Sequence, residues 1–350
     1  MQSPREYFSA LTTTVGENWN RFWYTPSDPF STSILRIIIG IAALYFVLSH
    51  SADLIRWFGN DGLLPSDTVT TLEQTIESAD PGVASISMPS LRMSYLHWIR
   101  SPFWLWTAHV TGLLIIVMFT IGLATRYTAL LSFVVVISYI NRAPMITGEF
   151  EPLLSMLLLY LCIAPAGVYL SLDRFLATRH NSINKGQQED GPSTSITATI
   201  AVRLMQIHLS MFYLLMPLSK LAGRTWWDGE AVWWLITRTE ARIVDLTFMH
   251  NVPDLVYLWT HLIVLFELCF AVLIWNRWAR PLLLMLSVPM WISLGLITGL
   301  VSFSMIMLAG NLVFIPAEVQ RDAWNWLMAK TGIKAQQDDP IQAAKETATA

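Results

Sequence analysis

Residues 196–220, ITATIAVRLMQIHLSMFYLLMPLSK, combine an apolar run long enough to cross a membrane with a regular series of polar side chains. A helix needs about 20 predominantly apolar residues to cross a hydrocarbon core of ~30 Å. Residues 254–275 form a second such run. Four further runs lie at about residues 34–54, 103–123, 127–142 and 152–172.

The last apolar region runs from Pro281 to Pro316 and is too long for one crossing. Its 36 residues (281–316) would form a helix of about 54 Å at a rise of ~1.5 Å per residue. Gly295 and Gly299 offer a break, so we predict two spans here. The sequence therefore predicts an all-α, polytopic transmembrane helix bundle of about eight spans. Seven spans is the alternative if this region crosses once.

The composition agrees with a multi-span membrane protein. Hydrophobic residues make up 54% of the chain and charged residues 13%, about half the charged share of a soluble domain. The net charge of −3 gives nucleic-acid binding no electrostatic support, so the lipid bilayer is the expected partner. Cys162 and Cys269 both lie in apolar runs, which argues against a disulfide framework or a cysteine metal site.

Less apolar segments flank and interrupt the predicted membrane domain, residues 34–316. Residues 1–33 place apolar side chains at steps of three and four, as in an amphipathic helix that lies in the membrane interface or packs on the end of the bundle. Residues 180–195 read as a flexible linker, and residues 222–253 as an interfacial helix on the outer side. Residues 317–350 read as a short amphipathic segment followed by a disordered tail.

Loop charges predict the orientation of the chain. With the N-terminus inside, the inner segments carry more lysine and arginine than the outer ones. The first 33 residues show no secretory signal, so we expect insertion to start from the first span.

Six residues of the stretch quoted above are spaced by three or four positions. They are Arg203, Gln206, Ser210, Tyr213, Pro217 and Lys220. Such spacing places them on one face of one helix, and a polar face in a membrane must turn toward the bundle interior or a wet cavity. It indicates either a functional site that ends at Lys220 or a snorkelling lysine with hydrogen bonds between helices; both interpretations stay open.

Other polar residues in the predicted spans are also candidates, because burying a charge in lipid costs several kcal/mol. Glu267 lies mid-span and needs a cation, a hydrogen-bond donor or a proton. His261 shares its helix but lies about 120° round, and a lone histidine is more often structural. Arg36 in the first span is either a site residue or an anchor at the inner end. Glu151 begins the fourth span. No metal-binding motif is present.

Several motifs, taken in order, resemble the horizontally transferred transmembrane (HTTM) family, which includes the membrane domain of vitamin K-dependent γ-carboxylase and many short bacterial members. These motifs are Leu35-Arg36-Ile37, Asp61-Gly62-Leu63-Leu64-Pro65, Asn141-Arg142-x-Pro144, Ser171-Leu172-Asp173, Gln206…Tyr213…Lys220-Leu221…Trp227-x-Gly229-x-Ala231, His261…Glu267 and Phe303-Ser304…Met307. The resemblance implies a multi-pass protein of the bacterial cytoplasmic membrane. It also implies a reduced isoprenoid quinone as cofactor and Lys220 as the base that acts on it.

Departures from the family pattern change the expected function. Only 34 residues (317–350) follow Pro316, where the carboxylases have a large lumenal domain. Trp291 stands where carboxylase-like members have histidine, and Gly148–Glu151 replaces an Asn-His pair. We therefore do not expect glutamyl carboxylation.

Three functions remain. The first is a quinone-linked membrane oxidoreductase with Lys220 as base, and with Glu267, His261, Asn141 and Arg142 as further site residues. The second is a non-enzymatic maturation, export or immunity factor for a secreted peptide. The third is a transporter, which predicts two related halves that the sequence does not display.

Overall fold

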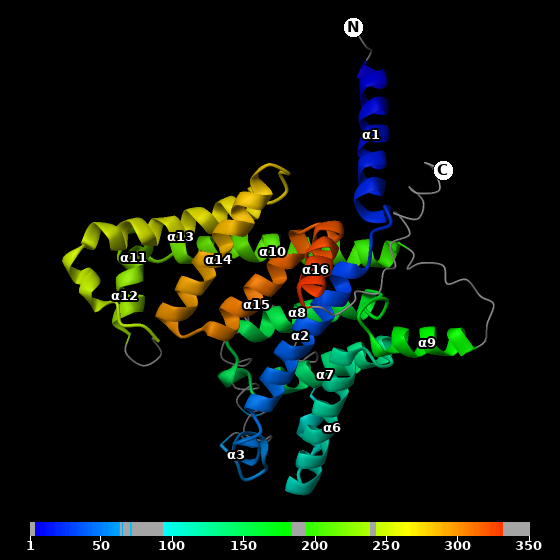
Figure 1. Cartoon of the computed structure of the whole chain (residues 1–350). Coiled ribbons are helices and arrows are strands. Elements are labelled where there is room, and N and C mark those ends of the chain that lie inside the picture. The colour runs from blue at the N-terminus through cyan, green and yellow to red at the C-terminus, as the bar shows by residue number, and fades with distance from the viewer. Residues whose placement is uncertain are drawn as a thin grey trace.

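A computed structural model describes residues 4–63, 65, 71, 94–183, 194–238 and 243–331. These residues form helices, turns and loops, and no β-strand occurs among them apart from one isolated bridge between Ser27 and Ser195. The predicted all-α helix bundle is therefore confirmed (Figure 1).

Five helices are long and apolar enough to cross a membrane. They are α2 (Phe30–Ser49), α6 (Pro102–Ile121), α10 (Ile196–Leu221), α13 (Pro253–Leu273) and α14 (Ala279–Thr298). A sixth span is possible if Val301–Phe314 and Ala317–Thr331, which meet at a bend of 114°, are taken together. The chain is accordingly a multi-pass membrane protein by length and hydropathy of its helices.

The expected count of eight spans is not confirmed. Three predicted spans fall short of the length or the hydropathy that a crossing requires: α7 (Thr125–Arg142), α8 (Phe150–Ile163) and α15 (Val301–Asn311). Helix α7 carries an arginine near each end, α8 has 14 residues and α15 has 11.

Proline and glycine explain where two of these helices end. The fourth predicted span, 152–172, was too long: α8 ends at Ile163, because Pro165 holds Ala164 in an extended conformation. The predicted break in the last apolar region is confirmed at Gly299, which has a left-handed φ of 72° between α14 and α15. Gly295 instead lies inside α14, against Ser304.

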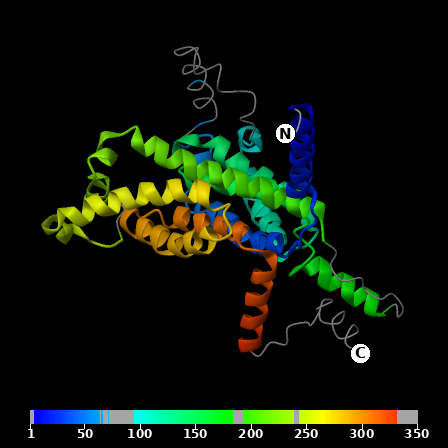
Figure 2. The same ribbon diagram turned by 90° about the horizontal axis from the view of Figure 1, so that it is seen from above.

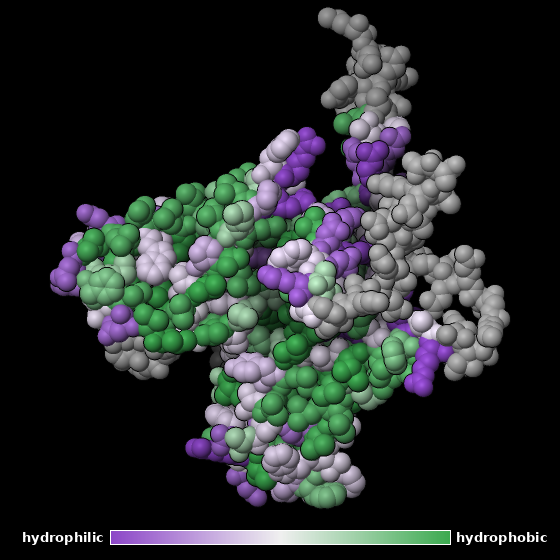
Figure 3. All heavy atoms as spheres, viewed as in Figure 1, coloured by the Kyte–Doolittle hydropathy of each residue, from purple (hydrophilic) through white to green (hydrophobic). Residues whose placement is uncertain are grey.

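The helices pack around α2 and α10. Helix α2 contacts α6, α7, α8 and α15, and α10 contacts α13 and α8. Figure 1 shows α13 lying over part of α10, and Figure 2 shows the same pair from above, where the two helices cross at an angle. The core between them is apolar, with Ile39, Met205, Leu209, Phe270 and Trp291 almost completely buried. Figure 3 shows apolar side chains over the outer faces of α6, α13 and α14.

Two helices outside the main bundle lie in the predicted flanking segments. Helix α1 (Pro4–Tyr24) stands away from the bundle, with Val15 and Trp19 each 59% exposed (Figure 1). Among the α1 side chains that the structure describes, only Phe22 and Trp23 are partly buried, and the ring of Phe22 contacts Trp275. Helix α16 (Ala317–Thr331) lies in the predicted C-terminal amphipathic segment, and the predicted tail beyond it lies outside the described residues.

Two other predicted segments differ from expectation. Helix α9 (Leu172–Ile183) extends into the predicted linker, of which residues 184–193 lie outside the described part of the chain. The expected single interfacial helix is a series of short ones: α11 (Arg224–Trp227), α12 (Ala231–Thr237) and η4 (Thr247–Asn251). Residues 239–242 between them are likewise not described.

Candidate functional site

The polar face of α10 turns into the bundle. Gln206, Ser210, Tyr213 and Pro217 are buried, as the spacing predicts. The face does not form one continuous site, however. Its side chains make three separate sets of contacts, one at each end of α10 and one in its middle.

The set at the C-terminal end of α10 is an ion pair between Lys220 and Glu267. The Lys220 ammonium donates a hydrogen bond to Oε1 of Glu267, whose side chain is 0% exposed against 18% for Lys220. The ring of Trp226 lies 5.1 Å from the same ammonium. Glu267 therefore has the cation that its position requires. Its second oxygen, Oε2, is buried and has no hydrogen-bond partner among the described residues.

The middle set joins three helices through one hydroxyl. Tyr213 accepts a hydrogen bond from Nε1 of Trp291 at 2.7 Å and exchanges hydrogen bonds with the amide of Asn311 at 3.0 and 3.1 Å. Its ring stacks on Phe270 with 3.9 Å between centroids. A phenol offers one donor and two acceptor sites, so this hydroxyl is already saturated and serves packing.

The set at the N-terminal end of α10 holds other segments against this helix. Arg203 donates to Oε1 of Gln206 at 2.9 Å and to the carbonyl of Phe22 at 3.3 Å, and its guanidinium lies over the Phe22 ring. Gln206 in turn donates to the carbonyl of Val313 at 2.7 Å. Arg203 and Gln206 thus hold α1 and the end of α15 in place. Ser210, between these sets, has a buried hydroxyl without a described partner.

Four predicted site residues lie elsewhere on the bundle. His261 is exposed, and its Nδ1 pairs with the carbonyl of Tyr257 one turn earlier on α13. Glu151 accepts a hydrogen bond from the backbone N–H of Gly148 at 2.7 Å, at the start of α8. The structure does not bring these two to Lys220. Asn141 and Arg142 end α7, which packs on α2, α6 and α8 rather than on the α10–α13 pair.

Arg36 lies near the N-terminal end of α2 and is completely buried. It donates to the carbonyl of Leu170 at 2.5 Å, and its guanidinium fills the notch left by Gly122, where an added Cβ would lie 1.6 Å from Nη1. Gly122 has a left-handed φ of 77°. This packing supports a role of Arg36 in joining α2 to the α6–α7 turn and the α8–α9 loop.

Asp173 completes that junction. Its carboxylate accepts hydrogen bonds from the backbone of Ala124 at 2.7 Å and of Thr125 at 2.9 Å, and from the Thr125 hydroxyl, at the start of α7. Burial alone would raise the pKa of Asp173, but these hydrogen bonds and the charge of Arg36 outweigh it and lower the pKa below its ordinary value.

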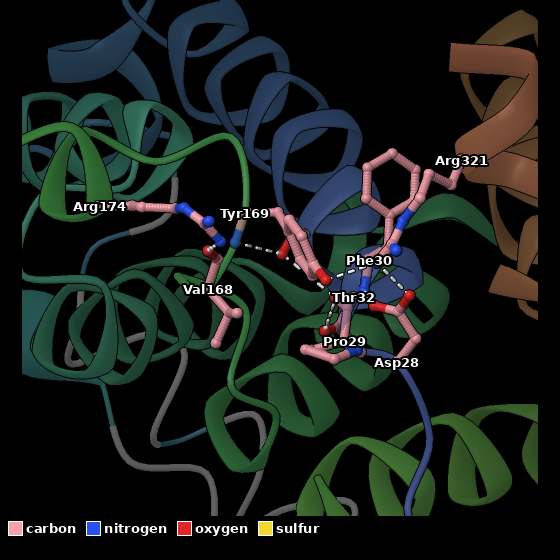
Figure 4. A network of polar contacts seen from close by, with 9 residues as sticks. Asp28, Pro29, Phe30, Thr32, Val168, Tyr169, Arg174 and Arg321 are labelled. Atoms are coloured by element: carbon pink, nitrogen blue, oxygen red, sulfur yellow. Dashed lines mark hydrogen bonds and ion pairs between the residues drawn. The ribbon is translucent and has the colours of Figure 1, made fainter. Parts of the chain in front are cut away.

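A second polar network, drawn in Figure 4, fastens α16 to the start of α2. Arg321 forms an ion pair with Asp28 and donates to the hydroxyl of Tyr169 at 2.5 Å. Arg174 lies over the other side of the same ring and donates to the carbonyl of Val168. Burial, followed by the negative charge of Asp28, raises the pKa of Tyr169 to about 12.

Sequence reasoning missed a buried histidine network. In α6, Nε2 of His109 lies 2.8 Å from the Ser51 hydroxyl, and its Nδ1 lies 2.6 Å from the Tyr139 hydroxyl. His109 and Tyr139 are both buried. The sequence does contain a signal for this network, because a histidine inside an apolar stretch is unusual and needs hydrogen-bond partners.

Two open grooves are hollowed in the surface. One, of about 510 Å³, lies between α6, α7 and the short helix η2 (Tyr95–Trp98). The other, of about 480 Å³, lies between Trp106 and the segment around α3 (Leu54–Phe58). Neither is lined by Lys220 or Glu267.

Comparisons with protein-family models, with curated proteins and with solved structures find no match. The resemblance to the HTTM family therefore stays a prediction.

Proposed function

We propose that this multi-pass membrane protein is a quinone-linked enzyme in which Lys220 acts as a base, with Glu267 as its proton partner. The single observation that carries the proposal is the buried pair itself. A carboxylate with 0% exposure, paired with an amine at the end of a membrane-spanning helix, is expensive to maintain for stability alone.

In the proposed reaction a proton passes between the two members of this pair. Moving the proton from the Lys220 ammonium to Glu267 leaves a neutral amine and a neutral carboxylic acid. The neutral amine can then accept a proton from a bound hydroxyl group, and Glu267 holds the proton that the amine gave up. The two side chains together therefore support general base catalysis without solvent.

The residues beside Lys220 fit the chemistry of an isoprenoid quinol. The Lys220 side chain is 18% exposed, so it is not sealed inside the core. The buried Oε2 of Glu267 is an acceptor without a described donor, and Trp226 offers a flat aromatic face. A bound quinol would supply an acidic hydroxyl and two-electron redox chemistry.

The proposal is tested by the quinone content of the purified protein. Protein extracted in mild detergent should carry isoprenoid quinone in solvent extracts analysed by mass spectrometry. Lys220→Arg keeps a cation for Glu267 but cannot deprotonate, so it should fold, retain quinone and fail to form the quinolate absorbance as pH is raised.

Lys220→Ala should lose the quinone. Arg224→Ala is the matched control, because Arg224 lies one turn away and is paired only with exposed Asp228. It should behave as the unmodified protein. Absence of quinone from the unmodified protein, or equal quinone content in Lys220→Ala, would overturn the proposal.

A non-enzymatic peptide maturation factor is a second candidate. It is favoured by the two grooves, which avoid Lys220, and by the saturated hydroxyl of Tyr213. In that case the ion pair between Lys220 and Glu267 is structural. The double variant Lys220→Met/Glu267→Met should then keep the fold and still support maturation of the peptide. If the protein is instead a quinone-linked enzyme, the same double variant should fold but lose its enzymatic activity.

A further inference from the structure

The groove between α6 and α7 is an elongated slot rather than a rounded pocket. Its α6 wall is formed by Trp104, Ala108, Thr111 and Ile115, which are spaced by four, three and four residues and so lie along one face of the helix. Eleven residues of helix extend over about 16 Å. The slot therefore runs parallel to α6, in the direction of a membrane crossing.

The walls of the slot are apolar along its length. The α7 side consists of Leu131, Val134 and Val135, and the α6 side adds Gly112 and Ile115. The hydroxyl of Thr107 is satisfied by the carbonyl of Phe103. Deep inside, the slot thus suits a hydrocarbon chain rather than a polar group.

Charge is concentrated at one end of the slot. Arg100 lines the groove where η2 joins α6, is exposed, and forms no ion pair with any residue that the structure describes. Trp98 and Trp104 flank this end and are 76% and 61% exposed. Exposed tryptophans of this kind lie at the level of lipid headgroups. The charged end of the slot thus sits at the interface and its apolar length extends into the hydrocarbon.

We propose that this slot binds an anionic phospholipid, with one acyl chain between α6 and α7 and the phosphate at Arg100. Along the slot the charge of Arg100 comes first, then the two exposed tryptophans, then the apolar walls. A phospholipid in one leaflet has the same order: phosphate, headgroup interface, acyl chain. The guanidinium forks onto phosphate oxygens with charge-assisted hydrogen bonds. The volume of about 510 Å³ lies within the usual range of ligand pockets, ~300–1,000 Å³.

The test compares lipids of equal chain length and different headgroup charge. Delipidated protein in detergent is titrated with phosphatidylglycerol or with phosphatidylcholine, and bound lipids are counted by native mass spectrometry. We expect one phosphatidylglycerol to bind at least tenfold more tightly than phosphatidylcholine. Arg100→Gln should remove that preference.

Two variants complete the design. Thr111→Phe fills the slot from an exposed position of α6, so it should weaken binding of both lipids while the thermal midpoint stays unchanged. Arg56→Gln removes an exposed arginine of another outer segment, one already paired with Asp53, and should leave the preference intact. Equal binding of the two lipids, an unchanged preference in Arg100→Gln, or displacement of the lipid by a neutral isoprenoid quinone would overturn the proposal. None of these outcomes depends on Lys220.

Discussion

Replacing Gly122 by alanine should severely destabilise the end of the bundle where α2 begins and α6 ends. Gly122 ends α6 with a φ of 77°, and an alanine in the left-handed region costs about 1–2 kcal/mol. The new Cβ would also lie 1.6 Å from Nη1 of Arg36 and 2.6 Å from Cβ of Ser171. Because Arg36 is fully buried, its guanidinium has no free volume into which it can move.

Displacement of the Arg36 guanidinium accounts for the larger part of the lost free energy of unfolding. Arg36 would lose its 2.5 Å hydrogen bond to the carbonyl of Leu170 and its approach to Asp173. Leaving a buried charge without its partner costs about 3–5 kcal/mol, so we expect a total of roughly 4–7 kcal/mol. That is comparable with the whole stability of many domains, ~5–15 kcal/mol.

Unfolding in mixed detergent micelles, followed by far-ultraviolet circular dichroism, measures this loss. Gly148→Ala is the control, because its φ is not left-handed and the nearest atom to an added Cβ lies 3.6 Å away. It should change the free energy of unfolding by less than ~0.5 kcal/mol. In an Arg36→Met background, Gly122→Ala should cost clearly less, since the flexible methionine can yield. A Gly122→Ala variant within ~1 kcal/mol of the unmodified protein would refute the reasoning.

Three further outcomes follow from the polar contacts. The lowered pKa of Asp173 adds stability that is present above its unfolded pKa and is lost as pH falls through the folded pKa, so acid unfolding of the Asp173→Asn variant should show a weaker pH dependence. Tyr139→Phe removes the partner of His109 Nδ1 and should lower the free energy of unfolding by about 1–3 kcal/mol; an unchanged value would mean that water replaces the hydroxyl. Arg321→Ala should release α16 while the rest of the bundle stays folded, seen as faster hydrogen exchange confined to residues 317–331; uniform protection would contradict the role of the Asp28 ion pair.

Long-range contacts separate what the sequence could predict from what it could not. Hydrophobic length alone locates α2, α6, α10, α13 and α14, because crossing a membrane demands a nearly fixed number of apolar residues. The end of α8 was misplaced, although Pro165 was visible. Hydropathy stays high beyond Pro165, so hydropathy alone predicts a longer helix than the proline permits.

In the candidate site, too, the sequence predicts local geometry but not contacts between helices. The inward face of α10 follows from its spacing, because side-chain direction in a helix is local geometry. The pairing of Lys220 with Glu267 depends on the register between α10 and α13, which no local pattern encodes. The same holds for Trp291 and Asn311, whose meeting at Tyr213 requires three helices to be placed first. His109 could have been chosen as a buried residue, but its two hydroxyl partners could not.

The ion pair between Asp28 and Arg321 joins residues 293 positions apart. A ribosome releases Asp28 long before Arg321 exists, so the beginning of α2 enters the bilayer without its final partner. During biogenesis that carboxylate must stay hydrated at the membrane surface until α16 arrives. The closing of the bundle at this end is therefore a late event of synthesis, and chains halted before residue 321 should expose the loop around Asp28 to membrane-associated proteases.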